Sequence, residues 1–198
     1  MSGYLVAGRY RLAKKILAGD PVRGIPALWQ AEDAGDVYYV KAWRRRGDDR
    51  ADIKALWNRE VRGLTRLQGH PGAAELFVRL HDLISDDRNY YAVLNGGRRV
   101  LLSEALQDRS RCPWLTNLSE VGRRRPLWEG LLRIAKALAM LHGEGTLHRS
   151  LTATAVFVAP EGLGDFRLRG RYKITDLTWK FKPLKSHIII FCGGVVTL

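Results

Sequence analysis

The stretch "GTLHRSLTATAVFV", residues 145–158, brings three side chains of chemical use close together. His148 and Arg149 directly precede Ser150, and an apolar segment follows them. A histidine beside a serine is the minimum needed for a base-activated nucleophile. The stretch lacks the G-x-S-x-G turn that presents such a serine in hydrolases, so a nucleophilic serine is a weak hypothesis here.

Two charged residues further upstream lie within apolar patterns. Lys41 belongs to "VYYVKAW" at 37–43, where strand alternation places it in a row of apolar and aromatic side chains. Glu60 lies inside the apolar stripe of a helix predicted over 52–67. A carboxylate is costly to bury without a partner. Glu60 therefore either pairs with Lys41 or lies at the edge of the stripe and reaches water, and the spacing favours neither.

The segments that would position these residues begin as strands and continue as helices. Strands are predicted over 9–18, 27–31, 37–43, 76–84 and 89–94, around the helix at 52–67. Further elements are predicted as a short helix over 101–107, a polar loop over 108–126, a long helix over 127–142 with Pro126 in its first turn, and a strand over 171–175. This order predicts a two-lobed α+β fold, with a β-rich N-lobe holding one helix, an incomplete helical C-lobe, and a hinge near 95–97.

The composition supports a folded domain with a basic surface. The chain has 198 residues, of which 46% are hydrophobic, enough to bury a core. The formal net charge of +13 comes largely from arginine clusters, which attract phosphate, nucleic acid or anionic surfaces. Acidic runs lie beside some of these clusters, so the alternative is that scattered arginines simply solvate the surface.

The cysteines and the first residues bear on location. Cys112 and Cys192 form no CxxC pair, which supports neither a disulfide framework nor a zinc site. The opening stretch "MSGYLVAGRYRLAKK" holds no apolar core long enough for a signal peptide, and no membrane span is expected. A cytoplasmic location is therefore predicted.

The order of these motifs resembles the eukaryotic-like serine/threonine protein kinase family over residues 9–178. "YYVKAW" resembles the family's V-A-I-K strand, and "NREV" at 58–61 places a glutamate on the next helix. "GHPG" resembles the turn after that helix, "LHRSLTATAVFV" the catalytic-loop frame H-R-D-L-x-x-x-N, and "KITDLT" the aspartate of D-F-G. The resemblance implies an N-lobe over about 9–95 and a partial C-lobe over about 98–178, and leaves 179–198 as a tail outside the family pattern.

The resemblance implies ATP and Mg²⁺ as ligands. Lys41 would contact phosphate oxygens, with Glu60 as its partner on the helix, and Asp176 would ligate the metal. The alternative for Asp176 is an aspartate that caps a turn after a strand.

The glycine-rich loop departs from the family pattern. Pro21, Arg23 and Pro26 stand in the three glycine positions. Glycines there let backbone N–H groups approach phosphate, and proline has no N–H to offer. Arg23 would contribute to an unusual phosphate cradle, or the loop no longer grips phosphate, and the second interpretation is favoured.

The roof of the nucleotide pocket departs as well. The family has a small alanine over the adenine ring two positions before its lysine, and this chain has Tyr39 there. The phenol ring is expected to occupy the space of adenine. The alternative is that Tyr39 swings aside and stacks on a ligand.

The catalytic loop keeps its outline and loses its reactive groups. Counting from His148 and Arg149, Ser150 replaces the base aspartate and Ala155 replaces the metal-binding asparagine. A serine is a poor proton acceptor at neutral pH, and alanine has no ligand atom. His148 and Arg149 have structural roles in the family, so they support the fold and not the activity.

The C-terminal end departs from the family too, because the helical lobe of kinases continues well beyond D-F-G. Residues 179–198 include "SHIIIFCGGVVTL", an apolar tail expected to cover exposed core, to form an oligomer contact or to reflect a truncated reading frame. The apolar face of the helix at 127–142, made of Leu127, Leu131, Leu138 and Leu141, is expected to be exposed and to favour self-association.

These features predict a truncated pseudokinase-like domain that binds a protein partner and is catalytically impaired. The first alternative is a divergent active serine/threonine kinase, working through Lys41 and Asp176. The second is a basic nucleic-acid-associated module. Enzymatic activity stays open at this point, and both ATP and Mg²⁺ are doubtful ligands.

Overall fold

The structure is a computed structural model that describes residues 4–45, 50–111, 119–148, 151–160, 166–169 and 173–174. The strands are β1 (Leu5–Val6), β2 (Tyr10–Leu17), β3 (Ala27–Asp33), β4 (Asp36–Arg44), β5 (Arg79–Ser85), β6 (Asn89–Asn95), β7 (Val100–Leu101), β8 (Thr146–Leu147), β9 (Val156–Val158), β10 (Phe166–Leu168) and β11 (Lys173–Ile174). The helices are α1 (Arg50–Gln68), α2 (Ala73–Leu76), α3 (Leu102–Gln107) and α4 (Val121–Gly143), with 3₁₀ turns η1 (Arg109–Arg111) and η3 (Ala153–Ala155).

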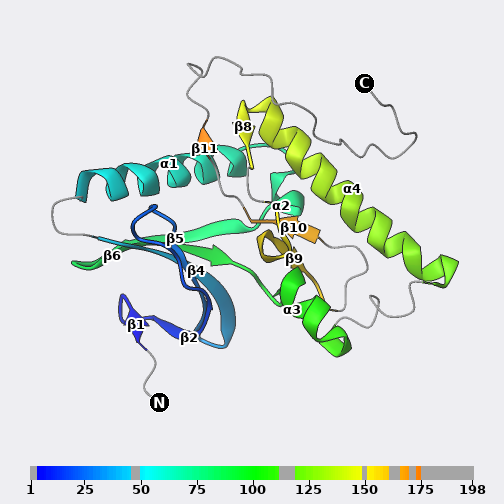
Figure 1. Ribbon diagram of the computed structural model, residues 1–198, viewed down its shortest axis with the longest axis horizontal. Helices are drawn as coiled ribbons and strands as arrows, with labels where there is room; N and C mark the ends of the chain where they lie inside the picture. Colours follow the sequence, from blue (N-terminus) through cyan, green and yellow to red (C-terminus); the bar gives the residue numbers. More distant parts are fainter. Residues whose placement is uncertain are drawn as a thin grey trace.

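The N-terminal half is a six-stranded sheet with one long helix. The sheet has the order β1-β2-β3-β4-β6-β5, and each neighbouring pair is antiparallel. Helix α1 lies along one face of this sheet (Figure 1). The predicted strands at 9–18, 27–31, 37–43 and 89–94 and the predicted helix at 52–67 correspond to β2, β3, β4, β6 and α1.

The second half contains α3, α4 and short strands. A three-stranded sheet has the order β10-β9-β7, and β8 pairs with β11. Figure 1 shows the long helix α4 on the side away from β1, with β9, β10 and α3 between it and the first sheet. The α+β, two-lobed class predicted from the order of elements is confirmed.

One apolar core crosses from the first lobe into the second. Leu28 of β3, Tyr39 of β4 and Leu94 of β6 belong to the same buried cluster as Leu141 of α4 and Phe157 of β9. Buried apolar contact of this kind is the main stabilising contribution in a protein fold. The two lobes are therefore joined by packed side chains where the protein kinase resemblance expects a nucleotide.

Two predicted boundaries are wrong. The strand predicted from residue 76 begins at Arg79, because Ala73–Leu76 forms the helical turn α2. Helix α4 begins at Val121, within the predicted loop, so Pro126 lies inside the helix and not in its first turn. The segment "VGRRR" carries no apolar periodicity to reveal the helix, although arginine is a good helix former.

The apolar face of α4 divides into two parts. Leu127 and Leu138 pack against the large core and Leu141 belongs to it, so the expectation that this face is exposed is wrong for these three. Leu131 is exposed instead, together with Trp128 and Leu132, which are 56% and 54% exposed. Within the residues that the structure describes, no helix is both long enough and apolar enough to cross a membrane.

Candidate functional site

Lys41 and Glu60 form a buried ion pair. The ammonium of Lys41 donates a hydrogen bond to Glu60 Oε1, and the two residues are 1% and 6% exposed. The spacing left open whether Glu60 pairs with Lys41 or reaches water, and in the structure it pairs with Lys41. The fold buries the Glu60 carboxylate, and the ammonium of Lys41 offsets the free-energy cost of burying that charge.

Strand register and helix periodicity place this pair. In the sheet, Lys41 lies opposite Leu28 of β3 and Ala92 of β6, two buried residues on the face toward α1 and the second lobe. Glu60 projects from α1 between the buried positions Ile53 and Leu64. Because residues seven or four apart share a helix face, Glu60 is directed to the sheet.

Tyr39, two positions before Lys41 on β4, is buried between the lobes. Its side chain is 1% exposed, and its hydroxyl donates a hydrogen bond to the backbone oxygen of Arg99 at 2.9 Å. Its ring meets Phe157 of β9 edge-on, with ring centroids 4.5 Å apart and planes inclined by 74°. At this separation no planar ring fits between the two aromatic side chains.

Gly96 closes the space around the Tyr39 ring from a third side. A Cβ at Gly96 would lie 2.4 Å from Tyr39 Cε2 and 2.5 Å from Tyr39 Cδ2. The backbone of the hinge segment therefore touches the edge of the phenol ring, and only glycine permits this approach. The ring is held by Gly96, Phe157 and the Arg99 carbonyl together.

The backbone N–H groups of the loop between β2 and β3 donate to acceptors within the same loop. Asp20 Oδ1 accepts the N–H groups of Val22 at 3.0 Å and Arg23 at 3.3 Å. Asp20 and Ile25 exchange two backbone hydrogen bonds of 2.9 and 2.8 Å, and Gly24 N–H donates to the Pro21 oxygen at 3.4 Å. Since prolines 21 and 26 have no N–H, every N–H from residue 20 to 26 is already engaged. The side chain of Arg23 is largely exposed and pairs with Asp20 at 3.5 Å.

The tip of this loop rests on α1. A Cβ at Gly24 would lie 2.3 Å from Leu56 Cδ1, and the loop residue has a φ of +64°. The glycine allows both the left-handed backbone conformation and the close approach to the helix. The loop thus packs against the helix that carries Glu60.

His148 and Ala155 brace the chain near β9 and β10. His148 is buried, and its Nε2 donates to the backbone oxygen of Arg169 at 2.8 Å. The N–H of Arg169 in turn donates to the oxygen of Ala155 at 2.7 Å. These contacts give His148 a structural position, while Ala155 is buried with no side-chain ligand atom. Arg149, Ser150 and Asp176 lie outside the described residues.

The described residues do not fit a bound nucleotide. Tyr39 takes the volume that the family's alanine leaves for adenine, and the loop N–H groups that would face phosphate are satisfied internally. Lys41 is 1% exposed and lies within the core. In the part of the chain that the structure describes, no three His, Cys, Asp or Glu side chains cluster as metal ligands.

Some residues of this arrangement escaped sequence reasoning. Phe157, Gly96 and Asp20 shape the closed cleft, yet none was singled out as a site residue. The "NGG" break at 95–97 marked the hinge, and the aspartate before Pro21 is typical of a turn, so both carried a local signal. Phe157 carried none, because only the tertiary contact pairs it with Tyr39.

Among the described arginines, Arg44 and the pair Arg124 and Arg125 come from two clusters that lie apart. Arg44 ends β4 on the first lobe, whereas Arg124 and Arg125 lie in the first turns of α4. Figure 1 shows these two regions at opposite ends of the molecule. Arg167 of β10 donates a hydrogen bond to the Ala74 oxygen at 2.5 Å and supports the packing of α2.

Comparison with known proteins identifies the fold. No family profile matches the chain. A stretch covering 41% of the chain is 31% identical over 85 residues to the serine/threonine-protein kinase ppk11 of Schizosaccharomyces pombe, and it spans 27% of that protein. The crystal structure of a kinase domain superposes with a TM-score of 0.56 at 13% identity, covering 80% of this chain and 42% of the solved one. The chain therefore has a protein-kinase-like fold, as its motifs predicted, and spans less than half the length of either relative.

Proposed function

We propose that this chain is a protein-kinase-like domain that has lost phosphoryl transfer and acts by binding a protein partner. The observation that carries the proposal is the Tyr39 ring, packed between Gly96 and Phe157 where the family holds adenine. Phosphoryl transfer requires the nucleotide to be positioned and its charge neutralised, and a filled cleft allows neither.

Two further features support the loss of activity. The loop from Asp20 to Ile25 is closed on itself and leans on α1, so its N–H groups do not face a phosphate. Ala155 stands at a metal-ligand position of the family and offers no oxygen. The replacement of the family's base aspartate by Ser150 points the same way.

The partner part of the proposal has its own support. Trp128 and Leu132 expose a contiguous apolar surface on α4, next to the exposed Arg124 and Arg125. Leu131 is exposed on the same helix. Exposed aromatic and aliphatic side chains beside arginine are typical of protein interfaces. The same surface also suits a second copy of the chain.

An active, divergent kinase is the second candidate, and the Lys41–Glu60 pair favours it. This pair is the arrangement that active kinases need. In that case the Tyr39 ring would have to move out of the cleft when nucleotide binds.

A thermal-shift titration with ATP and Mg²⁺ separates the two candidates. A ligand that binds only the folded chain raises its melting temperature with concentration. We expect no shift for the wild-type chain. A stabilisation that Lys41→Ala abolishes would mean that the cleft binds nucleotide, and phosphate transfer lost on Asp176→Ala would establish an active enzyme.

A further inference from the structure

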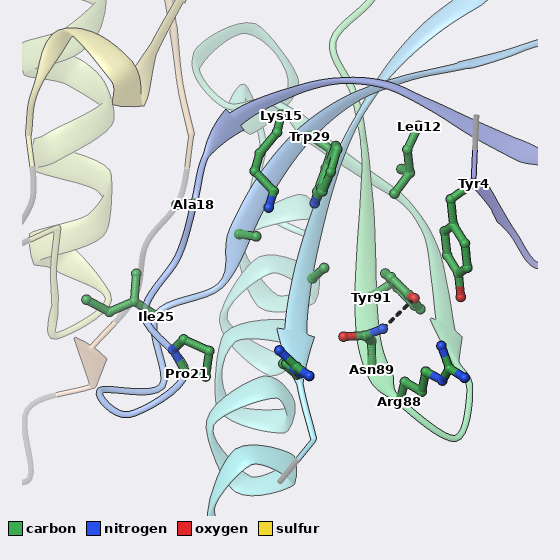
Figure 2. Close-up of a pocket in the computed structure, with 13 residues that line it drawn as sticks. Tyr4, Leu12, Lys15, Ala18, Pro21, Ile25, Trp29, Arg88, Asn89 and Tyr91 are labelled. Carbon is green, nitrogen blue, oxygen red and sulfur yellow. Dashed lines mark hydrogen bonds between the residues drawn. The ribbon is translucent and has the colours of Figure 1, made fainter. Parts of the chain in front are cut away.

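A pocket of about 450 Å³ lies on the face of the sheet opposite the Lys41–Glu60 pair (Figure 2). Its lining includes Trp29 of β3 and Ala42 of β4, which alternate along their strands with Leu28 and Lys41. Successive side chains of a strand point to opposite faces, so the floor of this pocket faces away from the Lys41–Glu60 pair. Pro21 and Ile25 of the β2–β3 loop border the pocket at one end. Its volume lies in the range of small-molecule sites.

The pocket has an apolar and aromatic interior. Leu12, Trp29, Ala42 and Tyr91 contribute to it from four neighbouring strands. Figure 2 shows Lys15 beside Trp29 on one side, and Tyr91, Asn89 and Arg88 on the other. Flat aromatic surfaces of this kind bind planar rings well.

Three cationic side chains line the same pocket. Lys15 of β2 places its ammonium 4.7 Å from the centre of the Trp29 ring, its direct cross-strand neighbour. Arg44 ends β4, and Arg88 lies in the turn between β5 and β6. Within the described parts of the chain, none of the three forms an ion pair with a carboxylate. Their charge is available to an anion.

The carboxylate near this end of the sheet is already engaged. Asp86 accepts hydrogen bonds from the Tyr91 hydroxyl at 2.8 Å and from the Tyr4 hydroxyl at 3.3 Å. It also accepts the N–H groups of Arg88 and Asn89 at 2.8 and 2.7 Å. Asn89 Nδ2 donates to the Tyr91 hydroxyl at 2.8 Å, as the dashed line in Figure 2 marks. These bonds hold the Tyr91–Asn89 wall in place. Among the described residues, Asp86 forms no ion pair with Lys15, Arg44 or Arg88.

We propose that this pocket binds a small phosphorylated aromatic molecule, with its ring on the apolar floor and its phosphate among the cations. Arginine matches phosphate geometry with paired N–H donors, and several cations suit a dianion better than a carboxylate. The pocket lies on the face of strands β3 and β4, whose backbones are paired on both sides. Addition of a peptide strand is therefore excluded here, and recognition rests on side chains. The proposal goes beyond the proposed function, because the side chains that would bind the ring and the phosphate lie on the other face of the sheet.

Isothermal titration calorimetry with phenyl phosphate tests the pocket on the full chain. We expect one saturable site, and Arg44→Ala or Lys15→Ala should raise its Kd about tenfold, the effect of losing one charged hydrogen bond. Lys14→Ala is the matched control. It removes the same charge from the same strand, but Lys14 reaches Glu104 of α3 at 2.6 Å and is not part of the pocket, so its Kd should stay unchanged.

A second variant tests the apolar floor without changing any charge. Ala42→Leu fills the pocket and should abolish phenyl phosphate binding, while inorganic phosphate should bind the wild type at least about tenfold more weakly than phenyl phosphate. Melting curves of each variant verify that it is folded.

Four results would overturn the proposal. One is the absence of saturable heat, and another is equal weakening by Lys14→Ala and Arg44→Ala, which would indicate only the attraction of a chain of net charge +13. Binding unaffected by Ala42→Leu would place the ligand elsewhere. A dimer in sedimentation that Arg44→Ala dissociates would assign the pocket to a second copy of the chain.

Discussion

The ring of Tyr39 lies edge-on against the ring of Phe157, with centroids 4.5 Å apart. One residue comes from the central strand of the first lobe and the other from β9 of the second lobe. Their contact joins the lobes through the core at the place where a kinase holds its nucleotide. This pair is the basis of the first prediction.

Removing the Tyr39 ring should reopen the cleft. Tyr39→Ala is expected to lower the unfolding free energy by about 3–5 kcal/mol, as large-to-small core substitutions do, because the ring is fully buried. It should also allow ATP to raise the melting temperature, which the wild type should not show. Tyr39→Phe keeps the ring and loses only the hydrogen bond to Arg99, so it should cost about 1 kcal/mol and leave the cleft closed. If Tyr39→Ala is folded and ATP does not raise its melting temperature, the ring is not what blocks nucleotide binding.

Gly96→Ala should destabilise the chain through the same ring. The new Cβ would overlap Tyr39 at 2.4 Å, which costs about 1–3 kcal/mol if the ring must shift. The double variant Gly96→Ala with Tyr39→Ala should cost less than the sum of the single variants, measured by urea unfolding. Gly122→Ala in α4 has open space around its Cβ and serves as the control, with a neutral or stabilising effect. Additive effects in the cycle would mean that Gly96 acts through something other than Tyr39.

Breaking the buried ion pair should be more harmful than replacing it. Lys41→Met or Glu60→Leu alone leaves one uncompensated buried charge and should cost about 3–5 kcal/mol. The double variant removes both charges and should recover much of that loss, as judged by chemical denaturation. Lys54→Met, on the exposed side of α1, should stay within about 0.5 kcal/mol of the wild type. A double variant less stable than either single one would contradict this expectation.

Asp86 should make the free energy of unfolding fall as the pH becomes acidic. Burial alone would raise the pKa of Asp86, but its hydrogen bonds from Tyr91, Arg88, Asn89 and Tyr4 lower the pKa below the ordinary value. A carboxylate with a lowered folded-state pKa stabilises the fold above its unfolded pKa of about 4, and this contribution is lost as pH falls through the folded pKa. Asp86→Asn should therefore cost about 1–2 kcal/mol at pH 7, and the difference from wild type should shrink below about pH 4. Denaturation curves across this range check it, and a difference that does not vary with pH would rule out the ionised carboxylate as the cause.

The apolar surface of α4 should drive association. Trp128 and Leu132 are 56% and 54% exposed, and a contiguous surface of this kind favours contact with another chain. We expect the sedimentation coefficient of the wild type to rise with concentration, and Trp128→Ser to weaken this rise. Val22→Ser changes an even more exposed apolar residue, in the β2–β3 loop, and should have no effect. A chain that stays monomeric at all concentrations would contradict self-association through this surface.

Local periodicity placed Lys41 and Glu60 each within an apolar row but left open whether they pair. Strand alternation over 37–43 put the lysine on an inner face, and the helical stripe at 52–67 put the glutamate on the face toward the sheet. The patterns of period 2 and 3.6 could not exclude a Glu60 that reaches water at the edge of the stripe, and the structure decides for the ion pair. The order of the motifs predicted the protein-kinase-like fold.

Only the tertiary structure decided the state of the cleft. Whether Tyr39 filled its space or swung aside depended on Phe157, far along the chain, and on the Gly96 backbone. The start of α4 at Val121 also lay beyond local patterns, because its first turns are polar and exposed. Contacts between residues distant in sequence leave no periodic signal, and so the closed cleft and the opposite pocket appeared only when the strands were assembled into a sheet.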